Sequence, residues 1–193
     1  MESIAREVRL SGSGGQGLIL AGIILAEAAI HDGLNTVQTQ SYGPEARGGA
    51  SKAEVIISSG DIDYPKVAEP EVMLAMTQEA CDKYVGTLSN SGILIVDSTF
   101  VTEIPDTNAT VYSLPITKIA KEEIGKTLVA NIVALGAVTG LTNVVSHQAI
   151  VDAVLARVPK GTEELNEKAL SLGFEYANNA SREFAKGKML QAN

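Results

Sequence analysis

The segment "SGSGGQGLILAGIILAEAAI", residues 11–30, constrains the fold of this chain more than any other stretch of its sequence. It joins a run of glycines to an apolar segment of helix length, and the residues before it, "AREVRLSG", read as a short β-strand. Gly12, Gly14 and Gly17 satisfy the spacing G-x-G-x-x-G, in which glycines let a strand turn tightly into a helix. We therefore expect the chain to open with a strand, a glycine turn, and a helix that starts from Gly14 onward.

Strand and helix patterns alternate along the first half of the chain, and helical patterns follow. Further strands are expected at 35–40, 52–58, 71–76, 92–97 and 109–114. Helices are expected at 78–88, 115–125, 128–141 and 146–158, followed by a last helix with an apolar stripe from Leu165 to Phe184. This order predicts one α/β domain over residues 1–193, with a mostly parallel sheet flanked by helices, a Rossmann-like first βαβ unit and a helical C-terminal part.

Charge and hydropathy exclude two classes of partner. Lysine and arginine number 15 against 23 aspartates and glutamates, a formal net charge of −8, and no basic cluster breaks this balance. Binding to nucleic acid is therefore not expected. The apolar span from Leu18 to Ile30 is shorter than the ~20 residues that cross a membrane, and Glu27 interrupts it. The start of the sequence lacks a secretory-signal pattern, so we expect a cytoplasmic protein with no membrane association.

Side chains that usually carry redox or acid–base chemistry are scarce. A single cysteine, Cys81, allows no internal disulfide and no cysteine-ligated iron–sulfur cluster supplied by this chain alone, and we expect it to be buried on a helix face. His31 and His147 are expected at helix ends, where neither is placed as a general base. We therefore assign no catalytic residue and no metal ligand to this chain.

The glycine turn suits an anion, because backbone N–H groups at the positive end of a helix can face a phosphate. A dinucleotide site also needs an acidic residue about 20 positions further on, at the end of the second strand. That strand ends in "TQSYG", which offers Gln40 and Ser41 but no carboxylate. A stand-alone NAD(P)- or nucleotide-binding protein remains the alternative, and a glycine turn used only for close packing is a third interpretation.

A second glycine-rich segment, "SYGPEARGGAS", separates the second and third expected strands. Arg47 is suited to contact a phosphate or a carboxylate, or to pair with Glu45 inside the loop. Tyr42 is either an anchor for a partner or a residue that packs the loop, and Gly48-Gly49 permits positive φ angles. We expect this loop near the glycine turn at the carboxyl edge of the sheet, where α/β sheets bind ligands or partners.

Taken together, "GSGGQG", "SYGPEARGGASKAEVIIS" and "NIVALGAV" resemble the gamma subunit of 2-oxoacid:ferredoxin oxidoreductases. The resemblance runs from Val8 to Leu155 and is strongest to the 2-oxoglutarate branch. The positions that match the family pattern are Gly14, Gly15, Gln16, Gly17, Tyr42, Gly43, Arg47, Gly48, Gly49 and Asn131. Glu71 departs from it, because the family more often has aspartate there, and this weakens any ligand role for the carboxylate.

The resemblance implies a heteromeric enzyme that oxidatively decarboxylates a 2-oxo acid, transfers the acyl group to coenzyme A and reduces ferredoxin. It places thiamine diphosphate with Mg²⁺, and the iron–sulfur clusters, on partner subunits: alpha, beta and, in some enzymes, delta. Gly60-Asp61 followed by Ile62 does not give the thiamine diphosphate pattern in this chain, so the isolated chain is expected to be inactive.

Within such an enzyme the gamma subunit is implicated in subunit packing and in a coenzyme A site shared at an interface. The residues to which the resemblance assigns that site are Gly14, Gly15, Gln16, Gly17, Tyr42, Arg47, Gly48 and Gly49.

Two of the expected helices have almost no polar face. Leucine, isoleucine and valine occur around most of the circumference in residues 18–30 and 128–138. A helix that is apolar all round must be buried on several sides, and a sheet covers only one. We expect another chain to cover these helices. The alternative is coverage within the chain, which would require Asn131 to satisfy its amide internally.

Overall fold

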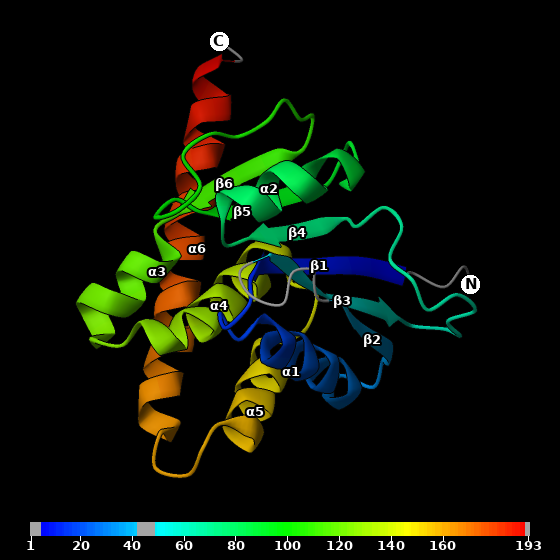
Figure 1. Cartoon of the computed structure of the whole chain (residues 1–193), viewed down its shortest axis with the longest axis vertical. Helices are drawn as coiled ribbons and strands as arrows, with labels where there is room; N and C mark the ends of the chain where they lie inside the picture. The colour runs from blue at the N-terminus through cyan, green and yellow to red at the C-terminus, as the bar shows by residue number, and fades with distance from the viewer. Residues whose placement is uncertain (1–4, 42–48, 192–193) are drawn as a thin grey trace.

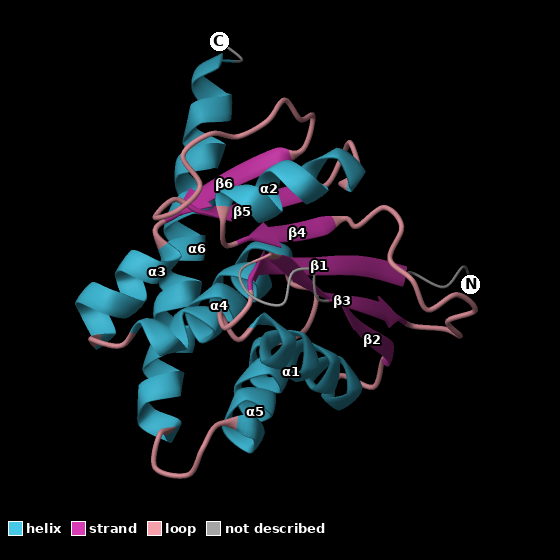
Figure 2. Cartoon of the chain, viewed as in Figure 1, coloured by secondary structure: helices cyan, strands magenta, loops and turns pink. Residues whose placement is uncertain are grey.

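The computed structural model describes residues 5–41 and 49–191, with side chains up to residue 186. Six strands form one sheet in the order β2-β3-β1-β4-β5-β6 (Figures 1 and 2). They are β1 (Ala5–Ser13), β2 (Asn35–Ser41), β3 (Ala50–Ser58), β4 (Val72–Ala75), β5 (Ile93–Asp97) and β6 (Thr110–Leu114). Three of the five neighbouring pairs are parallel, and β3 runs antiparallel to both β1 and β2. The predicted α/β class with a mostly parallel sheet is confirmed.

The placement of β3 modifies the Rossmann-like first unit. β1, α1 (Leu18–His31) and β2 form the expected strand–helix–strand sequence, but β3 lies between the two strands. Only residues 42–49 connect β2 to β3. A parallel crossover needs a dozen or more residues, so β3 has to return antiparallel.

Helices cover the two faces of the sheet unequally (Figure 2). The remaining helical segments are α2 (Gln78–Tyr84), η1 (Val85–Thr87), α3 (Ile116–Ile119), a π-helical turn (Ala120–Ile124), η3 (Thr127–Val129), α4 (Ala130–Thr142), α5 (His147–Arg157) and α6 (Glu163–Gln191). On one face, Leu74 and Ile95 belong to the larger core cluster, with residues of α1, α4, α5 and α6. On the other face, Met73 and Leu94 pack with Cys81 of α2. The expectation that β4 and β5 are buried on both faces is confirmed, because alternate side chains enter the two clusters.

The helix α4 is buried within the chain itself. Every residue from Ala130 to Thr139 is buried, and α6 crosses α4 with backbones in close approach at two glycines. A Cβ on Gly173 of α6 would lie 2.8 Å from the amide nitrogen of Ala137. The expectation that another chain covers this helix is wrong for α4, because α6 takes that place. Within the described residues, no helix is both long and apolar enough to span a membrane.

Several helix boundaries follow from local chemistry. The first helix begins at Leu18, not at Gly14, because Gly17 takes the left-handed conformation, with φ 74°, at its N-cap. Ser146 caps α5 as the sequence suggests, since its Oγ accepts a hydrogen bond from the Ala149 N–H at 3.2 Å. Residues 115–125 form one turn of α-helix and then the π-helical turn, which ends at Gly125 with φ 82°.

Candidate functional site

The glycine turn lies at the edge of the sheet where the parallel strands end. β1 ends at Ser13 and leads directly into the turn, while β4, β5 and β6 end along the same edge of the sheet at Ala75, Asp97 and Leu114 (Figure 1). In open α/β sheets, ligands bind at the carboxyl ends of the strands. The turn therefore occupies the position at which this fold is expected to bind a ligand or partner.

Two glycines of the G-x-G-x-x-G spacing are explained by packing inside the chain. The Gln16 side chain folds back over Gly12: its Oε1 accepts from the Ser13 N–H at 2.8 Å, and its Nε2 lies 3.5 Å from the Met76 carbonyl. Gly17 has positive φ and faces Asn131 of α4, whose Nδ2 donates to the Gly17 carbonyl at 3.2 Å. Asn131 is 5% exposed, and its Nδ2 finds this acceptor within the chain, as internal coverage of α4 requires.

Gly14 and Gly15 have the opposite environment. Both are exposed, and a Cβ added to either would meet no atom of the described chain within 4 Å. Their N–H groups have no hydrogen-bond partner among the residues that the structure describes. Gly15 needs glycine for its φ of 90°, but the geometry of the chain gives no such reason at Gly14. No described residue of the chain fills the space over Gly14 and Gly15.

Two cavities meet at Gly15, on either side of the exposed side chain of Leu128. The first has a volume of about 320 Å³ and is lined by Gln16, Met76, Phe100 and Thr117 among others. The second, about 310 Å³, is mostly apolar, with Lys126 in its lining, and further wall residues are Leu20, Ile132, Val158, Pro159 and Leu165. Leu128 is 81% exposed and Phe100 is 48% exposed. Apolar side chains, and backbone N–H groups that no described residue pairs, therefore lie on one edge.

A buried carboxylate fixes the wall of the first cavity. Asp97, at the end of β5, is fully buried and accepts hydrogen bonds from the Thr117 N–H at 3.1 Å, the Thr117 hydroxyl and the Thr99 N–H at 3.0 Å. These contacts hold the start of α3 against the loop that carries Phe100. Sequence reasoning missed Asp97, Thr117 and Phe100 as neighbours of the glycine turn.

The second glycine-rich segment reaches the same edge at its described end. Ala50 pairs with Ser13 in the β1–β3 ladder, so Gly49 lies next to the start of the glycine turn. The expectation that the loop approaches the turn is met for Gly49. Tyr42, Gly43, Arg47 and Gly48 lie outside the described residues, and their roles remain predictions.

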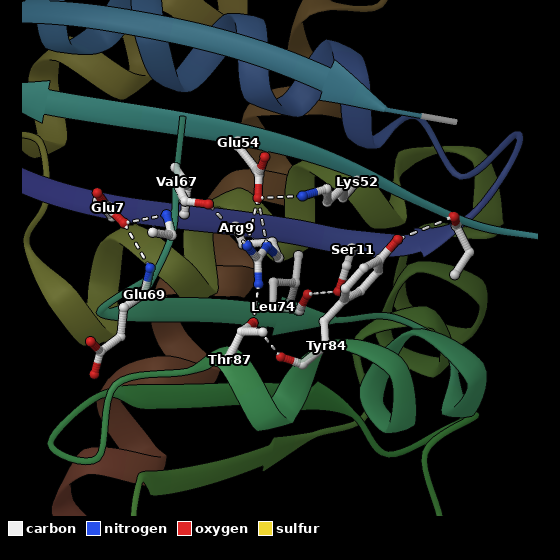
Figure 3. A network of polar contacts seen from close by, with 12 residues as sticks. Glu7, Arg9, Ser11, Lys52, Glu54, Val67, Glu69, Leu74, Tyr84 and Thr87 are labelled. Carbon is white, nitrogen blue, oxygen red and sulfur yellow. Dashed lines mark hydrogen bonds and ion pairs between the residues drawn. The ribbon is translucent and has the colours of Figure 1, made fainter. Parts of the chain in front are cut away.

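A charged network lies on the α2 face of the sheet (Figure 3). Arg9 of β1 is 3% exposed, and its Nε and Nη2 each lie 2.7 Å from Oε1 of Glu54, which is 7% exposed and directly opposite on β3. Lys52 Nζ lies 2.8 Å from the same oxygen, and Arg9 Nη1 donates to the Thr87 hydroxyl. Arg9 also lies over the Tyr84 ring, with its Cζ 5.5 Å from the centroid. The network ties α2 and η1 to β1 and β3.

The described titratable side chains are few at the glycine edge and do not cluster there. Cys81 is buried, and burial, with a smaller contribution from the Asp82 charge, raises the pKa of its thiol to about 11. No group of three histidine, cysteine or acidic side chains in residues 5–41 and 49–186 could hold a metal ion. His31 ends α1, and His147 begins α5 with its ring 4.5 Å from that of Phe174.

The sheet order also separates the elements that a dinucleotide site would need. Gln40, near the end of β2, is two strands away from the glycine turn because β3 intervenes. The dinucleotide-binding order instead places the second strand beside the first. Glu71 is exposed and precedes β4, so it lies at the opposite end of that strand from the turn.

Comparisons with known proteins agree with this geometry. The family described as pyruvate ferredoxin/flavodoxin oxidoreductase matches residues 7–176. The 2-oxoglutarate synthase subunit KorC of Methanocaldococcus jannaschii is 53% identical over 89% of this chain and 94% of that protein. A keto/oxoacid ferredoxin oxidoreductase gamma subunit from Geobacter sulfurreducens PCA is 55% identical, with a TM-score of 0.84 over 91% of this chain and 99% of that one.

The fold also occurs inside a longer protein. A chain of 2-oxoglutarate:ferredoxin oxidoreductase from Magnetococcus marinus matches with a TM-score of 0.81 at 23% identity, over 91% of this chain and 31% of that one. The resemblance of the glycine motifs to gamma subunits is confirmed by the closer relatives, and this chain belongs to the pyruvate ferredoxin/flavodoxin oxidoreductase family.

Proposed function

We propose that this chain is the gamma subunit of a 2-oxoglutarate:ferredoxin oxidoreductase and that its glycine edge contributes to the coenzyme A site. The complex converts a 2-oxo acid, coenzyme A and oxidised ferredoxin into the acyl-coenzyme A, carbon dioxide and reduced ferredoxin. Near 50% identity over almost the full length of a 2-oxoglutarate synthase subunit supports the choice of substrate.

The redox and decarboxylation groups belong to partners in this proposal. The alpha and beta subunits, with a delta subunit where the enzyme has one, supply thiamine diphosphate, Mg²⁺ and the iron–sulfur clusters. The buried, protonated Cys81 and the absence of a metal-binding cluster among the described residues support this division. This chain then contributes binding and packing and supplies no catalytic residue.

The observation that carries the coenzyme A assignment is the open edge at Gly14 and Gly15. Two consecutive N–H groups that no described residue pairs, just before a helix N-terminus, suit a phosphate, and the adjoining cavities offer apolar walls to the rest of the molecule. Gln16 and Gly17 set the shape of the turn, and Tyr42, Arg47, Gly48 and Gly49 complete the site from the second loop. The Magnetococcus marinus enzyme, which contains this fold, has been solved with 2-oxoglutarate, coenzyme A and succinyl-CoA.

The test is steady-state kinetics of the complex assembled from all subunits, with 2-oxoglutarate, coenzyme A and ferredoxin. Gly14→Ala should raise the KM for coenzyme A, because the added methyl group occupies the open space, whereas Gly86→Ala, at an equally open site in η1, should not. Arg47→Ala should raise the same KM by about 10–150-fold, the effect of losing a hydrogen bond to a charged group. Unchanged KM values for coenzyme A in both Gly14→Ala and Arg47→Ala would contradict the assignment.

The isolated chain provides the comparison with the nucleotide-binding alternative. We expect no turnover of 2-oxoglutarate by this chain alone and no saturable binding of NAD or NADP in calorimetry. Tight nicotinamide binding by the isolated chain would favour the alternative instead.

A further inference from the structure

The start of β3 is held from the α2 side by two side chains. The Ala50 N–H donates to Oε1 of Glu79 at 3.1 Å, and the Tyr84 hydroxyl donates to the Ala50 carbonyl at 3.4 Å. Both side chains belong to α2, and both polar groups of one backbone residue are therefore bound by one helix. Ala50 is the first residue of β3, where a strand without such contacts frays.

Tyr84 is itself held rigidly. Its ring lies beneath three cations, with Arg9 Cζ at 5.5 Å, Lys52 Nζ at 5.7 Å and Lys83 Nζ at 5.5 Å from the centroid. Arg9 is fixed in turn by Glu54, and Figure 3 shows the tyrosine beside this network with its hydroxyl directed toward the start of β3. Cation–aromatic contacts of this kind favour one ring position. A continuous set of contacts thus runs from the buried network through Tyr84 to Ala50.

The N-terminus of α2 is fixed as well. Thr77 caps the helix by accepting a hydrogen bond from the Ala80 N–H at 3.3 Å, and β4 ends just before it. Glu79 therefore projects from a helix whose first turn is attached to the sheet. Its side chain is exposed, and its bond to Ala50 is the contact that the structure gives it.

The position of Ala50 sets the spacing between Gly49 and Gly14. Ala50 follows Gly49 directly and pairs with Ser13, which precedes Gly14 directly. A shift of Ala50 along or away from β1 would therefore change the distance between Gly49 and Gly14. We propose that Glu79 and Tyr84 are positioning residues that hold Gly49 and Gly14 at the separation coenzyme A requires. This inference rests on the proposed function.

The test uses the complete enzyme complex and four single variants of this chain. Glu79→Ala removes the acceptor and should raise the KM for coenzyme A by about 3–10-fold, and Tyr84→Phe should raise it by about 2–5-fold, as loss of one hydrogen bond predicts. The KM for 2-oxoglutarate and the kcat at saturating coenzyme A should stay unchanged. Glu79→Gln keeps an oxygen acceptor and should restore most of the affinity. Asp82→Ala, on the same helix but without contact to Ala50, is the matched control.

The outcomes separate this inference from the proposed function. A raised KM for coenzyme A in Arg47→Ala and Gly14→Ala, with no change in Glu79→Ala and Tyr84→Phe, would overturn the positioning role and leave the coenzyme A site intact. An unchanged KM for coenzyme A in Arg47→Ala, Gly14→Ala, Glu79→Ala and Tyr84→Phe would refute the proposed site and the inference with it. Equal increases in both KM values, together with a lowered melting temperature of the variant chain, would show a merely structural role and overturn the inference.

Discussion

Replacing Gly17 by alanine tests the geometry of the glycine turn directly. Gly17 has φ 74°, a region in which an alanine costs about 1–2 kcal/mol. The new Cβ would also lie 2.6 Å from Nδ2 of Asn131, the group that donates to the Gly17 carbonyl. Displacing this amide loses a partly buried hydrogen bond of about 1 kcal/mol. We expect Gly17→Ala to lower the free energy of unfolding by about 2–3 kcal/mol, the sum of these two costs.

Two further variants separate the backbone cost from the side-chain clash. With Asn131→Ala in place, no amide opposes the new methyl group, so Gly17→Ala should then cost only about 1–2 kcal/mol. Gly33 offers an independent measure of the same backbone cost, because its φ is 75° and a Cβ there meets nothing within 4 Å. Gly33→Ala should therefore destabilise the chain by the same amount as Gly17→Ala does in a chain that already carries Asn131→Ala.

The measurement is urea unfolding of the isolated chain followed by far-UV circular dichroism, with the m-value checked for constancy between variants. A coupling of about 1 kcal/mol between positions 17 and 131 is the expected result. The reasoning is refuted if Gly17→Ala costs the same with and without Asn131, or if it costs no more than Gly33→Ala in the unaltered chain.

Three further predictions concern the rest of the fold. Gly173→Ala should destabilise the chain by about 3 kcal/mol or more in urea unfolding, because its methyl group would meet the α4 backbone at Val133 and Ala137, and a gain in helix propensity of about 1 kcal/mol does not offset this. Burial raises the pKa of the Cys81 thiol from 9.0 to about 11, so the folded state holds this proton more tightly and stability should fall as pH rises through this interval. Cys81→Ala should remove about 2 kcal/mol of that loss between pH 8 and pH 11, measured as the free energy of unfolding in urea at each pH. The same pH dependence of this free energy in both chains would contradict the prediction. Ser146→Ala should cost about 1 kcal/mol through the lost α5 cap, measured by thermal unfolding, and no loss would contradict the capping role.

Local chemistry was enough to predict most elements of this fold. The apolar runs that became β4 and β5, the serine cap of α5 and the apolar stripe of α6 are all readable within a few residues of sequence. Strand order is a different matter, because it depends on pairing between distant segments. Arg9 illustrates this point: its partner Glu54 is 45 positions away and can be recognised only once the antiparallel register of β1 and β3 is known.

The burial of α4 shows what hydrophobic periodicity can and cannot predict. An apolar circumference indicates that a helix is surrounded, but it does not identify the neighbour. The neighbour is α6, and the signal for it lies in two glycines, Gly136 and Gly173, which allow the two backbones to touch. Each glycine is unremarkable alone in the sequence, and their complementarity exists only in the packed pair.

The glycine spacing reads as one motif in the sequence, yet the structure places its glycines in two different environments. Gly12 and Gly17 make room for side chains of the same chain, and these roles need the positions of Gln16 and Asn131, which the spacing does not contain. Among the glycines of the turn, only Gly14 has neither a crowded Cβ position against the described residues nor a positive φ angle. Packing among the described residues therefore explains Gly12 and Gly17 but not Gly14.

The exposed apolar side chains gather beside the glycine turn. With α4 covered by α6, the apolar surface that remains for a partner is found elsewhere, and Leu128 is the most exposed large apolar residue of the described chain, at 81%. Leu128 and Phe100 both line the cavity beside Gly15. A subunit that covered them would also close this cavity and exclude water from the N–H groups of Gly14 and Gly15, which strengthens their interaction with an anion. Under the proposed function, subunit packing and coenzyme A binding therefore take place on the same edge, and each favours the other.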